Sequence, residues 1–324
     1  MRFLQPVIAV ISKFLPLWIL CCAVIAYLIP ELFVSIRNLT SLALGVIFLL
    51  MGMTLSIDSL ISVVKNPKPS MIGVTLKWVI SVGISILLAY LFFADNPDLA
   101  AGIILAGSVS SGTSANLYSM IAGGEVALSL SMATVDTIIS PLLTPSLMQW
   151  FAGKFIEIHF WSLFLNIIYV VFIPLFLGVF LKWKWSEKVK VITPYTSILS
   201  MLALFIVVLS VVSNAQSSLQ QNLEWLPIIF IAVFLQVSIP MFLGYFLSKA
   251  FKLKEKNCRA ILFHTGICNT ALAATLAMQH INSIAAVPSV ANMIVNLTLG
   301  ALVANLFKYK FTINTDSNVI ESVQ

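Results

Sequence analysis

Two short polar stretches interrupt long apolar segments of this chain. The first reads Ser110-Ser111-Gly112-Thr113-Ser114-Ala115-Asn116, and the second reads His264-Thr265-Gly266-Ile267-Cys268-Asn269-Thr270. Each holds one glycine and one asparagine, and each lies inside a segment long enough to span a lipid bilayer. A helix that breaks at membrane depth is tolerated only where protein or a water-filled cavity covers its freed backbone groups. We therefore predict two interrupted helices inside a membrane bundle.

The composition of the whole chain agrees with a lipid environment. The chain has 324 residues, of which 60% are hydrophobic and 9% charged, and its mean hydropathy is +1.04. Soluble domains carry about 25% charged residues, and a soluble chain of this size could not bury so much apolar surface in one core. A soluble enzyme, a disordered chain and a nucleic-acid binder are therefore excluded, and the lipid bilayer is an expected partner.

Ten segments are apolar and long enough to be membrane-spanning helices. They cover residues 14–30, 38–57, 70–94, 98–121, 126–151, 160–181, 192–213, 225–248, 259–279 and 284–307. Because the connections are short, we expect one all-α bundle over residues 1–308, followed by a polar cytoplasmic tail over 309–324. Ten helices divide into two repeats of five, about 14–151 and 160–307, and an odd number in each repeat inverts the second repeat in the membrane.

The basic residues give the orientation of these segments. With the N-terminus inside, alternation places fifteen lysines and arginines in inner segments and only two, Arg37 and Lys154, in outer ones. An excess of lysine and arginine marks cytoplasmic loops. We therefore expect a multi-pass protein of the cell (inner) membrane with both termini in the cytoplasm.

The two polar stretches lie in corresponding spans, the fourth and the ninth. Corresponding interruptions in two inverted halves indicate a transporter site, because freed carbonyls can bind cations and half-helix N-termini can attract carboxylates. The alternative is close helix packing, which also uses glycine, serine and threonine. The candidate substrate-binding residues are Thr113, Ser114, Asn116, Gly266, Asn269 and Thr270.

Three ionisable residues lie inside predicted spans, where charge is expensive and usually functional. They are Lys77 in the third span, Asp136 in the fifth and His264 in the ninth. Helical spacing places Ser129 and Asp136 on one face of the fifth helix, directed to the bundle interior. Lys77 and Asp136 could form a structural ion pair or take part in coupling. His264 could be a neutral core histidine or a proton-sensitive group near the substrate.

Other classes of membrane protein fit less well. No motif of a metalloprotease, serine hydrolase or P-loop enzyme is present, and no activated nucleophile accompanies the three buried ionisable residues. A channel needs a continuous polar pore, whereas the polar residues here cluster at one depth. We expect a secondary transporter, with no catalytic residues and no metal-ligating set, over an intramembrane enzyme.

The ordered set of motifs resembles the bile acid:sodium symporter family. The residues that carry the resemblance are Met51-Gly52-Met53-Thr54-Leu55, Ala106-Gly107-Ser108, Ser111-Gly112-Thr113-Ser114-Ala115-Asn116, Gly124-Glu125-Val126-Ala127-Leu128-Ser129, Pro141-Leu142-Leu143-Thr144-Pro145, Asn257-Cys258-Arg259, Gly266, Asn269 and Ala271-Leu272-Ala273-Ala274-Thr275-Leu276-Ala277. They run through the whole chain in order.

The resemblance implies an architecture and a mechanism. Helices 1, 2, 6 and 7 would form a panel, and the others a core in which helices 4 and 9 unwind and cross. Family substrates are organic anions, either bile acids or, in bacteria, smaller carboxylates of the pantoate type. The substrate would lie between panel and core, where Thr113 and Asn269 occupy contact positions. Alternating access would be driven by two sodium ions.

This chain departs from the family pattern at the sodium sites. Of the first site, Asn116 and Ser129 match, whereas Ala115 and Ala133 replace the usual serine and threonine. His264 stands where the family has a glutamate shared by both sites.

At the second sodium site, Lys77 and Cys268 replace glutamines, and Asp136 replaces a serine. Sodium needs oxygen ligands, as other hard cations do, and a lysine ammonium at that place would repel it. Our hypothesis is that Lys77, supported by Asp136, takes the role of the second sodium. Transport would then be facilitated or proton-coupled, and sodium-coupled symport is the alternative.

Overall fold

The structure is a computed structural model, and it describes residues 14–55, 67–221 and 223–321. In these ranges the chain is helical, without a named strand. The α-helices are α2 (Leu15–Leu28), α3 (Leu39–Thr54), α5 (Pro67–Phe92), α6 (Pro97–Gly107), α7 (Thr113–Ile121), α8 (Val126–Phe151), α9 (Phe160–Ile167), α10 (Ile173–Lys184), α11 (Ser186–Ile192), α12 (Thr196–Gln221), α13 (Trp225–Ala250), α14 (Glu255–Gly266), α15 (Thr270–His280) and α16 (Val287–Glu321). Short helical turns are η1 (Pro30–Leu32), η2 (Val34–Asn38), η3 (Ala152–Lys154), η4 (Ile168–Phe172), η5 (Thr193–Tyr195) and η6 (Ile284–Ala286).

The described helices are those of a multi-pass membrane protein. Within the described ranges, seven helical stretches are long and apolar enough to cross a bilayer, and α2 and α6 are shorter apolar helices. The predicted fourth span divides into α6 and α7, and the predicted ninth span divides into α14 and α15. Both predicted interruptions are therefore confirmed. The last two residues of the predicted second span, 56 and 57, lie outside the described ranges, and α16 runs past residue 308 to Glu321.

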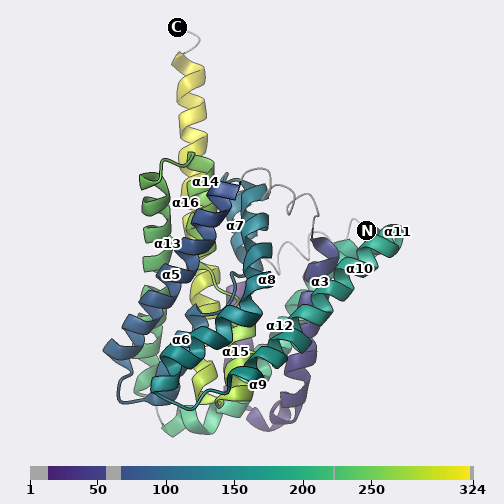
Figure 1. The fold of residues 1–324 in the computed structure, drawn as a ribbon, viewed down its shortest axis with the longest axis vertical. Coiled ribbons are helices and arrows are strands. Elements are labelled where there is room, and N and C mark those ends of the chain that lie inside the picture. Colours follow the sequence, from purple (N-terminus) through teal and green to yellow (C-terminus); the bar gives the residue numbers. More distant parts are fainter. Residues whose placement is uncertain (1–13, 56–66, 222, 322–324) are drawn as a thin grey trace.

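The helices pack in two groups (Figure 1). In the first group, α3 packs against α10 and α12, and α12 also packs against α2. The second group is built around α5, α13, α14 and α16, with α6, α7, α8 and α15 packed among them. In Figure 1 the first group leans away from the near-vertical α13 and α16. The candidate site lies where the groups face each other.

Glycines allow α3 and α10 of the first group to pack closely. A Cβ added to Gly178 of α10 would lie 3.0 Å from the Cα of Gly52 in α3 and 2.9 Å from the amide nitrogen of Met53. Helix pairs inside membranes approach this closely only where small residues line the contact. The glycine in the Met51–Leu55 motif therefore has a packing role.

Candidate functional site

The two helix breaks lie side by side and pair through their backbones. Ser111 and Cys268 form an isolated antiparallel bridge. The amide of Gly112 donates to the carbonyl of Ile267 at 2.9 Å, and the amide of Asn269 donates to the carbonyl of Ser110 at 2.8 Å. Backbone groups freed by one break are thus satisfied by the other, which is what burial at membrane depth requires.

Glycine is required where the breaks come closest. A Cβ on Gly112 would lie 2.8 Å from the carbonyl oxygen of Cys268, which is a backbone atom that cannot swing away. Gly266 serves a different contact, because its Cβ would lie 2.6 Å from Cβ of Met241 and 2.8 Å from the carbonyl oxygen of Val237 on α13. Gly266 therefore packs the broken helix against α13.

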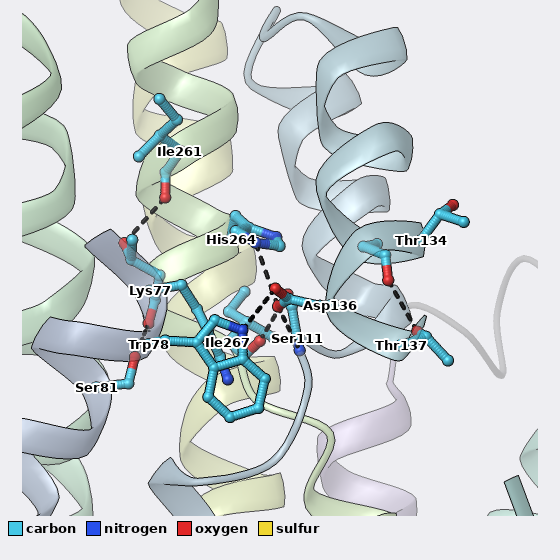
Figure 2. A network of polar contacts seen from close by, with 12 residues as sticks. Lys77, Trp78, Ser81, Ser111, Thr134, Asp136, Thr137, Ile261, His264 and Ile267 are labelled. Carbon is cyan, nitrogen blue, oxygen red and sulfur yellow. Dashed lines mark hydrogen bonds and ion pairs between the residues drawn. The ribbon is translucent and has the colours of Figure 1, made fainter. Parts of the chain in front are cut away.

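Asp136 is the centre of a buried polar cluster beside the crossing (Figure 2). The side chain is fully buried. Its Oδ1 accepts a hydrogen bond from Nε1 of Trp78 at 2.9 Å, and its Oδ2 accepts one from the amide of Ser111 at 3.2 Å. Nε2 of His264 lies 3.3 Å from the same Oδ2. One carboxylate thus joins α5, the first helix break and α14.

His264 is held near Asp136 without a well-aligned hydrogen bond. The imidazole is fully buried, and its Nε2 is at ion-pair distance from the carboxylate. Neither ring nitrogen has a hydrogen-bond partner of good geometry among the described residues. An imidazole and a carboxylate are therefore in contact beside the two helix breaks.

Lys77 reaches the first break from α5. Its fully buried ammonium donates to the carbonyl of Val109, a residue of the segment between α6 and α7. The Nζ atom also lies 3.4 Å from the ring centroid of Trp78, a cation–π contact. The amine of Lys77 therefore binds a carbonyl that the helix break has freed.

The direct Lys77–Asp136 pair that the sequence suggested is not formed among the described residues. The ion pair of Asp136 is with His264. Trp78 contacts both groups instead, because its ring faces the ammonium and its Nε1 donates to the carboxylate. The physical reason is that the freed carbonyl of Val109 offers Lys77 a closer partner.

A cavity of about 180 Å³ adjoins the other side of the crossing. Thr113, Ser114, Asn269 and Thr270 line it, as do Ser200 and Met201 of α12, Ile47 and Met51 of α3, and Asn296 of α16. The cavity therefore lies between the two helix groups, beside the first residues of α7 and α15.

Two of the predicted substrate residues lie elsewhere. Gly266 faces α13, and Asn116 accepts a hydrogen bond from Oγ of Ser129 at 2.7 Å. Neither is among the residues that line the cavity. The predicted buried face of α8 is confirmed, because Ser129 and Asp136 are both fully buried.

Sequence reasoning missed two residues of this region. Trp78 links Lys77 to Asp136, but an apolar aromatic residue next to a lysine carries no signal of that role. Asn296 is 2% exposed and its Nδ2 donates to the carbonyl of Cys268 at 3.3 Å. An asparagine inside an apolar helix is itself a signal, and it could have marked α16 as a helix that contacts the second break.

Broken helices whose breaks pair inside an apolar helix bundle, with buried ionisable groups and a cavity beside them, are typical of a membrane transporter. The chain belongs to the sodium bile acid symporter family. The model of that family matches residues 41–222. The architecture and the family together make the protein a transporter and not an enzyme.

Relatives cover most of the chain. It is 30% identical to the uncharacterized sodium-dependent transporter YocS of Bacillus subtilis, over 91% of this chain and 90% of that protein. It is 27% identical to the probable chloroplastic sodium/metabolite cotransporter BASS1 of Arabidopsis thaliana, over 92% of this chain and 74% of that protein. It is 25% identical to the human ileal sodium/bile acid cotransporter, over 79% of this chain and 75% of that protein.

Proposed function

We propose that the protein is a secondary transporter of a small organic anion. The cavity between the helix groups supports this proposal, because α7 begins at Thr113 and α15 begins at Thr270, and both residues line the cavity. Helix N-termini carry partial positive charge and bind carboxylates. The described residues lining the cavity include no lysine or arginine, so the helix ends supply the attraction for an anion.

The size of the cavity favours a small acid. Its volume is about 180 Å³, whereas pockets that hold drug-sized ligands measure roughly 300–1,000 Å³. A carboxylate of the pantoate type or smaller fits this space better than a bile acid. The substrate class is therefore a small carboxylate, bound by Thr113, Ser114, Asn269 and Thr270.

The same proposal includes the arrangement in the membrane. Ten spans form two inverted repeats, with α6–α7 and α14–α15 each counted as one broken span. The first helix group, with α9 and α10 as one continuous span, acts as the panel, and the second group acts as the core. The bias of lysine and arginine supports a cell-membrane protein with both termini, including the tail over 309–324, in the cytoplasm. Movement of the core against the panel would give alternating access.

Coupling rests on the contact of Lys77 with Val109. Freed carbonyls at helix breaks are the groups that bind coupling cations in transporters, and here the carbonyl of Val109 already accepts from an ammonium. A sodium ion at this place would compete with the Nζ atom of Lys77 for the same carbonyl oxygen and would be repelled by its ammonium form. We propose that Lys77 replaces one sodium and that transport does not require sodium.

Protons are the coupling ion that the buried cluster favours. The imidazole of His264 contacts the carboxylate of Asp136, and Lys77 on α5 and Cys268 in the second break are the other ionisable groups around them. Facilitated transport without coupling is the simpler alternative. Sodium-coupled symport is favoured by the names of the relatives and by Asn116 and Ser129, which match the first sodium site.

Counterflow in proteoliposomes tests the transport proposal. Vesicles loaded with an unlabelled small carboxylate should accumulate the labelled acid transiently, which an enzyme or a channel would not cause. Thr113→Val should raise the half-saturating concentration about tenfold, because one hydrogen bond to a charged group is lost.

Thr298→Val is the matched control for that variant. Thr298 is exposed and donates to the carbonyl of Ile294 within α16, so its loss should leave the half-saturating concentration unchanged. Equal effects of the two variants, or absence of counterflow with every small acid tried, would contradict a substrate site at the start of α7.

A further inference from the structure

The C-terminal turn of α15 is hydrogen-bonded to the first helix group. Nη2 of Arg37, in η2, donates to the carbonyl of Met278 at 3.0 Å. Nε2 of Gln279 donates to Oγ of Ser41 on α3, and its Oε1 accepts from Nδ2 of Asn166 on α9 at 3.0 Å. The last turn of α15 is thus joined to η2, α3 and α9.

The contact made by Arg37 is specific for a helix end. The last carbonyls of a helix lack intrahelical partners and carry the negative end of the helix dipole. Met278 lies in the last turn of α15, which ends at His280. A guanidinium therefore binds the C-terminus of the half-helix whose N-terminus adjoins the cavity.

Gln279 is the bridging residue because it uses both ends of its amide. The donor end contacts α3 and the acceptor end contacts α9, so one side chain holds α15 against two panel helices. A further bond, between Oγ of Ser162 and Nδ1 of His280 at 3.2 Å, lies next to it. A contact of this kind must break if the two groups separate here.

The hydrogen bonds of Gln279 and the cavity lie at opposite ends of α3 and α15. Ser41 is in the first turn of α3, whereas the cavity-lining Met51 is near its end. At 1.5 Å per residue the two positions are about 15 Å apart along the helix. The groups are thus joined at the end away from the basic loops and separated by a cavity toward the other end.

We infer that these contacts of Met278 and Gln279 with Arg37, Ser41 and Asn166 form an outer latch. The latch closes the outer entrance while the cavity opens inward, and its release is the step that admits substrate from outside. Gln279 is a positioning residue in this step and does not touch the substrate. The inference rests on alternating access as proposed above.

A distance measurement tests the latch without relying on transport. Spin labels would be attached at Glu31→Cys in η1 and Asp95→Cys between α5 and α6, two exposed positions on different groups. The background would carry Cys21→Ser and Cys22→Ser, because Cys21 is exposed. Gln279→Ala should increase the ratio of long to short label distances about tenfold, since two hydrogen bonds that favour the closed state are lost.

The control and a second variant keep the result decisive. Gln149→Ala removes an exposed glutamine of α8 outside the latch. This control variant should show the same spin-label distances as the parent protein. Arg37→Met provides a second way to open the latch if Gln279→Ala fails to fold. Unchanged distances in both latch variants would overturn the inference. Absence of anion transport, with distances that respond to the variants, would overturn the proposed substrate and leave the latch standing.

Discussion

Replacing Asp136 with leucine should abolish uptake and sharply lower the thermal stability of the purified protein. The carboxylate is fully buried and accepts from Trp78 and the amide of Ser111, beside His264. Its removal takes away the ion-pair partner of His264 and the carboxylate that stabilises the charged form of Lys77, and breaking a buried ion pair costs about 3–5 kcal/mol. It also leaves the Trp78 donor unpaired. Thermal unfolding in detergent and uptake into proteoliposomes measure the two effects.

A double variant separates folding from function in this experiment. Lys77→Met combined with Asp136→Leu removes two buried ionisable groups of the same cluster, and apolar replacement of buried ionic groups is often neutral for stability. The double variant should therefore recover most of the unfolding temperature but not the uptake. Asp95→Leu, at an exposed position, is the control and should retain both. Full uptake by the double variant would show that the cluster serves packing alone.

Lys77→Gln should reduce uptake at least tenfold in sodium-free buffer. The variant removes the charge that binds the carbonyl of Val109 and faces the ring of Trp78. Loss of a charge-assisted hydrogen bond in a buried site is worth about 1.5–3 kcal/mol, or roughly tenfold to a hundredfold. Since glutamine offers an oxygen ligand, added sodium should restore part of the uptake. Initial rates in potassium and in sodium buffers give the comparison.

The control for this variant lies on the same helix. Lys68 is exposed in the first turn of α5, so Lys68→Gln changes the net charge equally without touching the cluster. It should transport like the parent protein in both buffers. If Lys77→Gln also does so, the buried lysine only supports the fold.

The broken helices could be predicted because their signal is local. A glycine among small polar residues in the middle of an apolar span indicates a helix break, and the helices do end at the stretches around Gly112 and Gly266. The hydrophobic pattern likewise predicts the positions of the remaining helices, since period and length decide them. The sequence could also place Asp136 on a buried face, because helical spacing fixes direction.

The contacts within the site depend on the relative placement of distant elements. Lys77 and Asp136 have opposite charges, yet Lys77 donates to the freed carbonyl of Val109. Asp136 instead accepts from Trp78 and the amide of Ser111 and lies at ion-pair distance from His264. The separation of Asn116 from the cavity has the same origin, since it depends on how α7 packs against Ser129 of α8. None of these distances is encoded by spacing along the chain.

The contacts of the outer latch could not be predicted from the sequence either. The sequence marks Arg37 only as one of two outer basic residues, whereas its contact joins positions 241 residues apart. Gln279 lies within a predicted span, and no pattern in the sequence distinguishes it from its neighbours. A hydrogen bond between two helix groups is visible only when both groups are in place.

If Lys77 takes the place of a coupling sodium, as we propose, transport should proceed without sodium. The most direct measurement is the initial rate of uptake of a small carboxylate into proteoliposomes, with sodium replaced by potassium on both sides. The rate should stay within about twofold, because Lys77 already occupies the carbonyl oxygen of Val109 that a hard cation would need as a ligand. A fall of about tenfold or more, equal to at least about 1.4 kcal/mol of lost coupling energy, would contradict the claim.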